Sequence, residues 1–62
     1  MKTEEMIAEL GRRIRKLRQK LNISQAELSQ RADLSKTYLG EFERGQLTNI
    51  SISAIVRIAD IL

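Results

Sequence analysis

The side chains that could take part in chemistry are carboxylates, amines, guanidinium groups, hydroxyls and amides, because the 62-residue sequence contains no histidine and no cysteine. The commonest general base, the commonest zinc ligands and any disulfide are therefore excluded. The eight carboxylates follow no metal-ligand spacing, no serine lies in a nucleophile motif, and no glycine-rich loop could hold phosphates. We expect no enzymatic activity, no metal, no cofactor and no small-molecule ligand.

The basic side chains are concentrated in one segment. Eleven lysines and arginines stand against eight acidic residues, for a net charge of +3. A clustered positive face is expected of a protein that contacts phosphate groups, whereas a solvated helix face is the alternative. For most of the cluster we expect solvated side chains, with only a minority near phosphate. The cluster consists of Arg12, Arg13, Arg15, Lys16, Arg18 and Lys20.

The elements that must position these side chains are helices, because apolar residues recur at spacings of three and four. The first stripe predicts a helix over residues 4–21, with Thr3 as its N-cap and Glu4 and Glu5 in its positive first turn. The stripe consists of Ile7, Leu10, Ile14, Leu17 and Leu21.

No apolar stretch is long enough to span a membrane and no signal-peptide pattern is present, so we expect a cytoplasmic chain. Its length predicts one domain over residues 1–62.

A second, shorter helix is predicted over residues 25–32. Ser24 can cap it as part of a capping box, in which Glu27 would return a hydrogen bond to the serine N–H. Leu28 and Ala32 supply the inner face. The helix should end at Asp33, where we expect a positive φ.

A third helix is predicted over residues 36–44. Ser35 can cap its N-terminus, and Gly45 suits the left-handed position after its end. Leu39 and Phe42 would face the core at a spacing of three. The residues left facing outward are Lys36, Thr37, Gly40, Glu41 and Arg44.

A last helix is predicted over residues 52–62, with Ser51 as its N-cap. Its β-branched residues would also suit a strand, but their spacing of three and four and the lack of a pairing partner favour a helix. The apolar residues at this spacing are Ile52, Ile55, Ile58, Ala59 and Leu62.

Two short helices joined by a tight turn form a helix-turn-helix. A set of residues on and around these two helices matches one family of such proteins in order and spacing: Arg18, Leu21, Ile23, Ser24, Gln25, Glu27, Leu28, Leu34, Ser35, Tyr38, Leu39, Phe42, Glu43, Arg44, Gly45, Ile58, Ala59 and Leu62. On these residues, positions 7–62 resemble the Cro/C1-type, or Xre, family. The resemblance implies an all-α, lambda-repressor-like bundle of four helices (four to five in the family). It also implies a transcriptional regulator that binds double-stranded DNA in a sequence-specific manner. The neighbourhood of Tyr38, Glu43-Arg44-Gly45 and Asn49-Ile50-Ser51 further resembles controller proteins of restriction–modification systems.

Three side chains of residues 36–44 are candidate base contacts, and the resemblance points to the same three. Lys36 can donate to guanine O6 and N7, Thr37 can bond a base or contact a thymine methyl, and Glu41 can accept from cytosine N4. The alternatives are a phosphate contact for Lys36, a first-turn role for Thr37, and for Glu41 an ion pair within its helix, with Lys36 or Arg44. Gly40 is expected on the same face, either for close approach to the groove or with no role there.

Other polar residues are candidate phosphate contacts. Gln25 begins a helix whose free N–H groups favour an anion, and the family uses this glutamine on a phosphate. Its alternative is an ordinary polar residue of the first turn. The end of the third helix and the loop that follows run beside the DNA backbone in the family. They supply Arg44, Gln46, Thr48 and Asn49 as further candidates.

The resemblance also implies a structural pair. In the family, the arginine matching Arg18 bridges the glutamate matching Glu43, which would fix the third helix onto the first.

Ser29 departs from the family pattern, which has a small apolar residue at that position. Its hydroxyl therefore needs a hydrogen-bond partner, for which a carbonyl one turn earlier is a candidate.

The predicted regulator would bind a two-fold symmetric operator as a homodimer, with the two recognition helices about 34 Å apart. The alternative is an antitoxin-type or other protein-interaction module with the same fold. The candidate dimer residues could instead pack into the core of their own chain. We expect this core role for Ile52 more than for Ile61. These candidates are Ile50, Ile52, Ile61 and Leu62.

Overall fold

The computed structural model describes residues 2–62, and all regular structure in that range is helical. The helices are α1 (Thr3–Lys20), α2 (Gln25–Arg31), α3 (Lys36–Glu43) and α4 (Ile52–Ile61). The prediction of an all-α bundle of four helices is therefore confirmed, and each predicted boundary lies within one residue of the observed one. No helix in this range is both long and apolar enough to cross a membrane.

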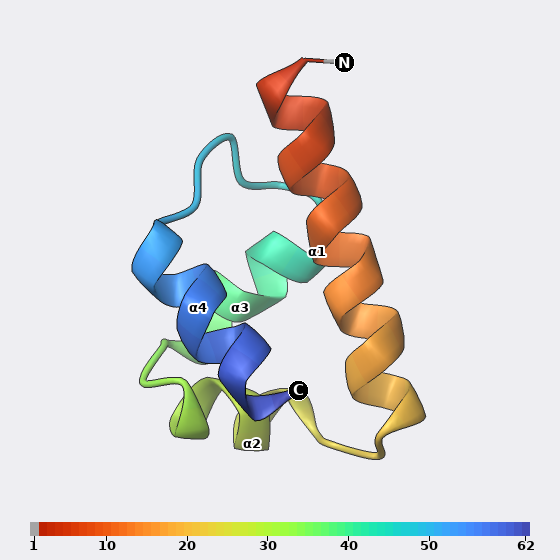
Figure 1. Cartoon of the computed structure of the whole chain (residues 1–62), viewed down its shortest axis with the longest axis vertical. Coiled ribbons are helices and arrows are strands. Elements are labelled where there is room, and N and C mark those ends of the chain that lie inside the picture. The colour runs from red at the N-terminus through yellow and green to blue at the C-terminus, as the bar shows by residue number, and fades with distance from the viewer. Residues whose placement is uncertain (1) are drawn as a thin grey trace.

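The long helix α1 runs down one side of the molecule, and the three shorter helices lie beside it (Figure 1). The main packing partner of α1 is α3, which also contacts α2, while α4 packs against α2. This arrangement encloses α3 on its inner side. Helix α3 is thus held by both α1 and α2.

Serine caps begin three of the four helices. The hydroxyls of Ser24, Ser35 and Ser51 each accept a hydrogen bond of 3.0 Å from the backbone N–H three residues later. All three predicted caps are confirmed. The predicted cap at Thr3 is wrong, because Thr3 is already helical and the N-cap is Lys2, which makes no side-chain capping bond.

The capping box at Ser24 is only half formed. The serine accepts from the Glu27 N–H, but the Glu27 carboxylate lies 3.4 Å from Arg31 rather than on the serine N–H. An ion pair one turn apart competes with the return bond of the box.

The turns between helices use left-handed backbone. Asn22, Asp33 and Gly45 have φ values of 58°, 55° and 74°, so the expectations for Asp33 and Gly45 are confirmed. In each case an N–H just beyond the helix bonds back to its last carbonyls. Arg57 of α4 lies 3.8 Å from the Asp33 carboxylate and fastens α4 to the turn between α2 and α3.

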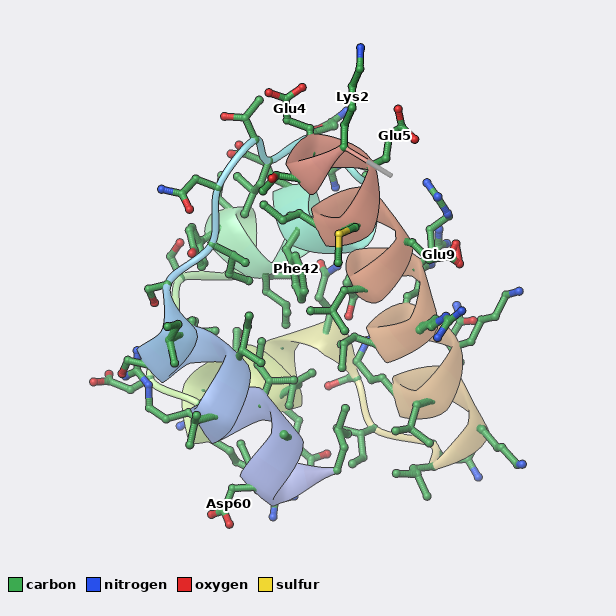
Figure 2. The ribbon with its side chains drawn as sticks, turned by 45° about the horizontal axis from the view of Figure 1, so that its top comes forward. Lys2, Glu4, Glu5, Glu9, Phe42 and Asp60 are labelled. Atoms are coloured by element: carbon green, nitrogen blue, oxygen red, sulfur yellow. The ribbon has the colours of Figure 1, made fainter. Side chains whose placement is uncertain are left out.

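The core lies where α2, α3 and α4 meet α1. Figure 2 shows Phe42 in the middle of the molecule, whereas the labelled charged side chains lie at its periphery. The predicted inward residues Leu28, Ala32, Leu39 and Phe42 are all buried. The other buried apolar residues are Ala54 and Ile58.

Two predicted apolar stripes are partly wrong. Leu17 of α1 and its C-cap residue Leu21 are exposed, and Arg18 takes the inward position at that level instead. In α4, Ala59 is exposed and Ile52 is 79% exposed, because at ~100° per residue Ile52 lies about 120° around the helix from buried Ile58. The expectation that Ile52 is a core residue more than Ile61 is therefore reversed, since Ile61 packs against the core.

The contact between α1 and α3 is a close approach of one backbone to another. A Cβ placed on Gly11 would collide with the Phe42 carbonyl oxygen and lie 2.8 Å from the carbonyl carbon. Only glycine allows this approach. The backbone of α3 is thereby seated directly on α1.

Candidate nucleic-acid interface

The outer face of α3 carries the three candidate base contacts. Lys36 and Thr37 are exposed in the first turn, directly after the Ser35 cap, and Glu41 is half-buried one turn later. Leu39 occupies the opposite, buried face. The helix therefore presents one polar face and buries the other, as a helix that enters a groove requires.

Gly40 does not belong to this outer face, which corrects the expectation. It is buried, and a Cβ there would lie 3.0 Å from an Arg44 guanidinium nitrogen and 3.5 Å from the Gln25 side-chain nitrogen. Its small size makes room for two neighbouring side chains rather than for DNA. Gln25 and Arg44, predicted separately as phosphate contacts, are thus brought together over this glycine.

A buried ion pair fastens the end of α3 to α1, as expected. Arg18 donates to both carboxylate oxygens of Glu43, through Nε at 2.8 Å and through Nη2 at 2.9 Å. Its Nη1 donates to the Ile23 carbonyl at 2.9 Å. The hydrogen bond to Glu43 raises the pKa of Arg18 above its ordinary value; burial opposes this shift, and the attraction of the carboxylate adds to it.

The same carboxylate also holds Gln25. The Gln25 Nε2 donates to Glu43 Oε1 at 3.1 Å, which leaves its second N–H free to donate elsewhere. Gln25 is the first residue of α2, and its backbone N–H lies at the positive end of that helix.

Deeper in α2, the buried Ser29 hydroxyl donates to the Ala26 carbonyl at 2.9 Å. A carbonyl about one turn earlier is therefore its partner, as expected.

A family model described as helix-turn-helix matches residues 14–62. The chain belongs to the Cro/C1-type helix-turn-helix family. No curated protein and no solved structure matches it.

In this helix-turn-helix protein, α2 and α3 are the two helices of the motif, and α3 is the second, or recognition, helix. The family comprises DNA-binding transcription regulators and is not a family of enzymes. Double-stranded DNA is accordingly the partner that the family assigns.

The loop after α3 carries the remaining candidate phosphate contacts. Arg44 Nε donates to Gln46 Oε1 at 3.3 Å, and the Gln46 N–H returns to the Glu41 carbonyl at 2.9 Å. Thr48 and Asn49 are exposed further along the loop. Arg44 and Gln46 therefore stay close to the recognition helix, whereas Thr48 and Asn49 lie beyond it.

A polar hollow of about 220 Å³ opens beside Gln25, and it includes one residue that the sequence did not single out. That residue is Arg15, which precedes Arg18 by three positions and so lies on the same side of α1. This spacing is the sequence signal that could have separated Arg15 from its neighbours. The residues lining the hollow are Arg15, Arg18, Gln25, Glu43 and Arg44.

Ion pairs divide the basic cluster of α1. Arg12 and Arg13 lie 3.3 Å and 3.5 Å from Glu9. Within residues 2–62, Arg15 and Lys16 have no carboxylate within 4.0 Å. The unbalanced positive charge of α1 is therefore shifted toward the half of the helix that adjoins α2 and the end of α3.

Proposed function

We propose that this helix-turn-helix protein is a cytoplasmic, sequence-specific transcription regulator whose recognition segment is residues 36–44. The observation that carries the proposal is the exposed first turn of α3. Lys36 and Thr37 stand in solvent, while the rest of the helix is fixed by buried Leu39 and Phe42 and by the pair between Arg18 and Glu43. A rigid helix with a free polar edge suits direct readout in the major groove.

Base discrimination would come from three side chains. Lys36 would donate to guanine, Thr37 would contact an adjacent base, and Glu41 would accept from cytosine N4, each contributing about 1–3 kcal/mol of discrimination. Glu41 forms no ion pair within residues 2–62, which removes the competing role that its charge suggested. Its carboxylate is thus available to a cytosine amino group.

Phosphate contacts would set the register of the protein on the duplex. Gln25 and Arg44 adjoin each other beside α3, and the loop adds further polar groups. The proposed set is Gln25, Arg44, Gln46, Thr48 and Asn49.

We further propose that the regulator, whether a repressor or an activator, acts as a homodimer on a two-fold symmetric operator. An apolar cleft of about 570 Å³ lies between the N-terminal half of α1 and the start of α4, with Ile50 in its lining. Ile52, on the following turn, is largely exposed. Of the four candidate interface residues, Ile52 is thus the most accessible to a partner, whereas Ile50, Ile61 and Leu62 are partly buried and pack against the core.

The test is selection of bound sequences from a randomised duplex pool at rising salt, for wild type and single variants. The proposal expects a palindromic consensus with half-sites about one helical turn apart. Lys36→Ala and Glu41→Ala should relax different positions of that consensus. The matched control Lys16→Ala, an exposed lysine on α1, should keep the consensus.

Recovery of no consensus, together with steep loss of binding as salt rises, would mean purely electrostatic binding and would contradict the proposal. A consensus that lacks two-fold symmetry would contradict the dimer alone.

A further inference from the structure

The hollow beside Gln25 is a meeting point of three helices. Arg15 and Arg18 come from α1, Gln25 begins α2, and Glu43 and Arg44 stand at the end of α3. No apolar side chain lines it. A polar concavity at the junction of three elements is a geometry in which several donors can converge on one ligand.

The charges in the hollow are not balanced. The Glu43 carboxylate is paired with Arg18, which donates to both of its oxygens, and it also accepts a hydrogen bond from Gln25. Arg15 has no carboxylate within 4.0 Å among residues 2–62, and Arg44 bonds only the neutral amide of Gln46. Two guanidinium groups are therefore uncompensated at the rim, so the hollow favours an anion.

The donors match a phosphate group in kind. Guanidinium groups present several N–H donors in a planar fork that fits phosphate oxygens. The Gln25 amide has one N–H pinned by Glu43 and a second N–H that remains available. Gly40 keeps space beneath Arg44, because a Cβ at that position would lie only 3.0 Å from the Arg44 guanidinium while it would make ordinary contact with Gln25 at 3.5 Å.

We propose that Arg15 extends the phosphate contact already proposed for Gln25 and Arg44, so that the three side chains hold one phosphate of the DNA backbone in this hollow. The inference rests on the proposed function and adds Arg15 as a phosphate contact from α1. It makes α1 part of the DNA-binding surface. Arg12 and Arg13, on the same helix, do not line the hollow, and both lie near Glu9.

The experiment measures affinity for a mixed-sequence duplex by fluorescence anisotropy over a range of potassium chloride concentrations. Each phosphate neutralised contributes about −0.9 to the slope of log affinity against log salt. Arg15→Gln should therefore bind more weakly and have a slope shallower by about 0.9. Between 0.05 M and 0.2 M salt it should lose about 3.5-fold less affinity than wild type does.

Arg13→Gln is the matched control, because it removes the same charge from the same helix at a side chain that is 77% exposed and paired with Glu9. It should keep a slope close to that of wild type. If Arg15→Gln and Arg13→Gln give equal slopes, the phosphate assignment is overturned while the proposed function stands. If wild type itself does not bind the duplex, the proposed function fails and this inference fails with it.

A second arm separates a backbone phosphate from a free one. Inorganic phosphate is titrated at constant ionic strength while the Arg15 Nε–H resonance is followed by NMR. The proposal expects only weak, non-saturating shifts, because a free anion lacks the other contacts of the duplex. Saturation at micromolar phosphate would assign the hollow to a free phosphate ligand and overturn the backbone assignment.

Discussion

Gly11→Ala should destabilise the protein strongly, although alanine favours a helix interior. The added Cβ would meet the Phe42 carbonyl group, with 2.8 Å to its carbon and 3.3 Å to the Phe42 Cδ1. Carbon atoms pack at about 3.5–4.0 Å, so α1 and α3 must separate by about 1 Å. Because the obstacle is backbone, no side-chain rotation can relieve the clash.

The magnitude follows from opposing terms. Alanine gains about 1 kcal/mol of helix propensity over glycine, while overpacking costs about 1–3 kcal/mol or more. Separation of the helices also loosens the packing of Phe42, which is fully buried. We expect a net loss of about 2 kcal/mol, from a total stability of roughly 3–9 kcal/mol for a domain of this size.

Thermal unfolding followed by circular dichroism at 222 nm measures this loss. A domain of this length shifts by about 4–8 °C per kcal/mol, so the Tm should fall by about 8–16 °C. Ala8→Gly is the control for propensity, because it makes the reverse exchange one turn earlier in α1 and should cost about 1 kcal/mol. A Gly11→Ala variant as stable as wild type would refute the backbone contact between α1 and α3.

Three further predictions concern the ion pair, Gly40 and the last cap. Glu43→Gln should lower the free energy of unfolding by about 3 kcal/mol, because it leaves the Arg18 charge buried without a partner; an additional Arg18→Met change should recover part of the loss, and urea unfolding would show whether it does. Since Glu43 raises the pKa of Arg18, this stabilisation is present below the unfolded pKa and is lost only as pH rises through the higher folded value; unfolding at pH 6 and pH 9 should therefore show no loss from this pair. Gly40→Ala should keep or slightly raise the Tm but weaken DNA binding, because its Cβ displaces the flexible end of Arg44; unchanged affinity would contradict this role. Ser51→Ala should cost about 1 kcal/mol in urea unfolding, whereas Ser51→Asn should cost little.

The helices and their limits could be predicted because the signals that set them are local. Ser24, Ser35 and Ser51 each act on an N–H three residues away, so no knowledge of the tertiary structure is needed to place them. The exception at Thr3 arises because the helix starts one residue earlier: the Lys2 carbonyl accepts from the Met6 N–H at 3.0 Å, although the Lys2 side chain makes no capping bond.

The direction of side chains was harder to predict, because it depends on the neighbours that each helix finds. Ile52 is apolar and lies three residues before Ile55 and six before Ile58, yet it faces solvent because the buried side of α4 is the side that carries Ile58. Gly40 lies under Gln25 and Arg44, which come from two different helices. The close approach at Gly11 is also a property of the packed pair, since nothing near it in the sequence marks the position of Phe42.

The seating of α3 on the Gly11 backbone has a consequence for how binding preference could change over time. The recognition helix is located by main-chain contact and by the pair at its C-terminal end, and Lys36 and Thr37 make no side-chain hydrogen bond or ion pair within residues 2–62. Substitutions at these two positions should leave the free energy of unfolding nearly unchanged. Under the readout proposed for Lys36 and Thr37, the DNA sequence that the protein prefers can then change without loss of fold stability, so target choice and stability are separable in this molecule.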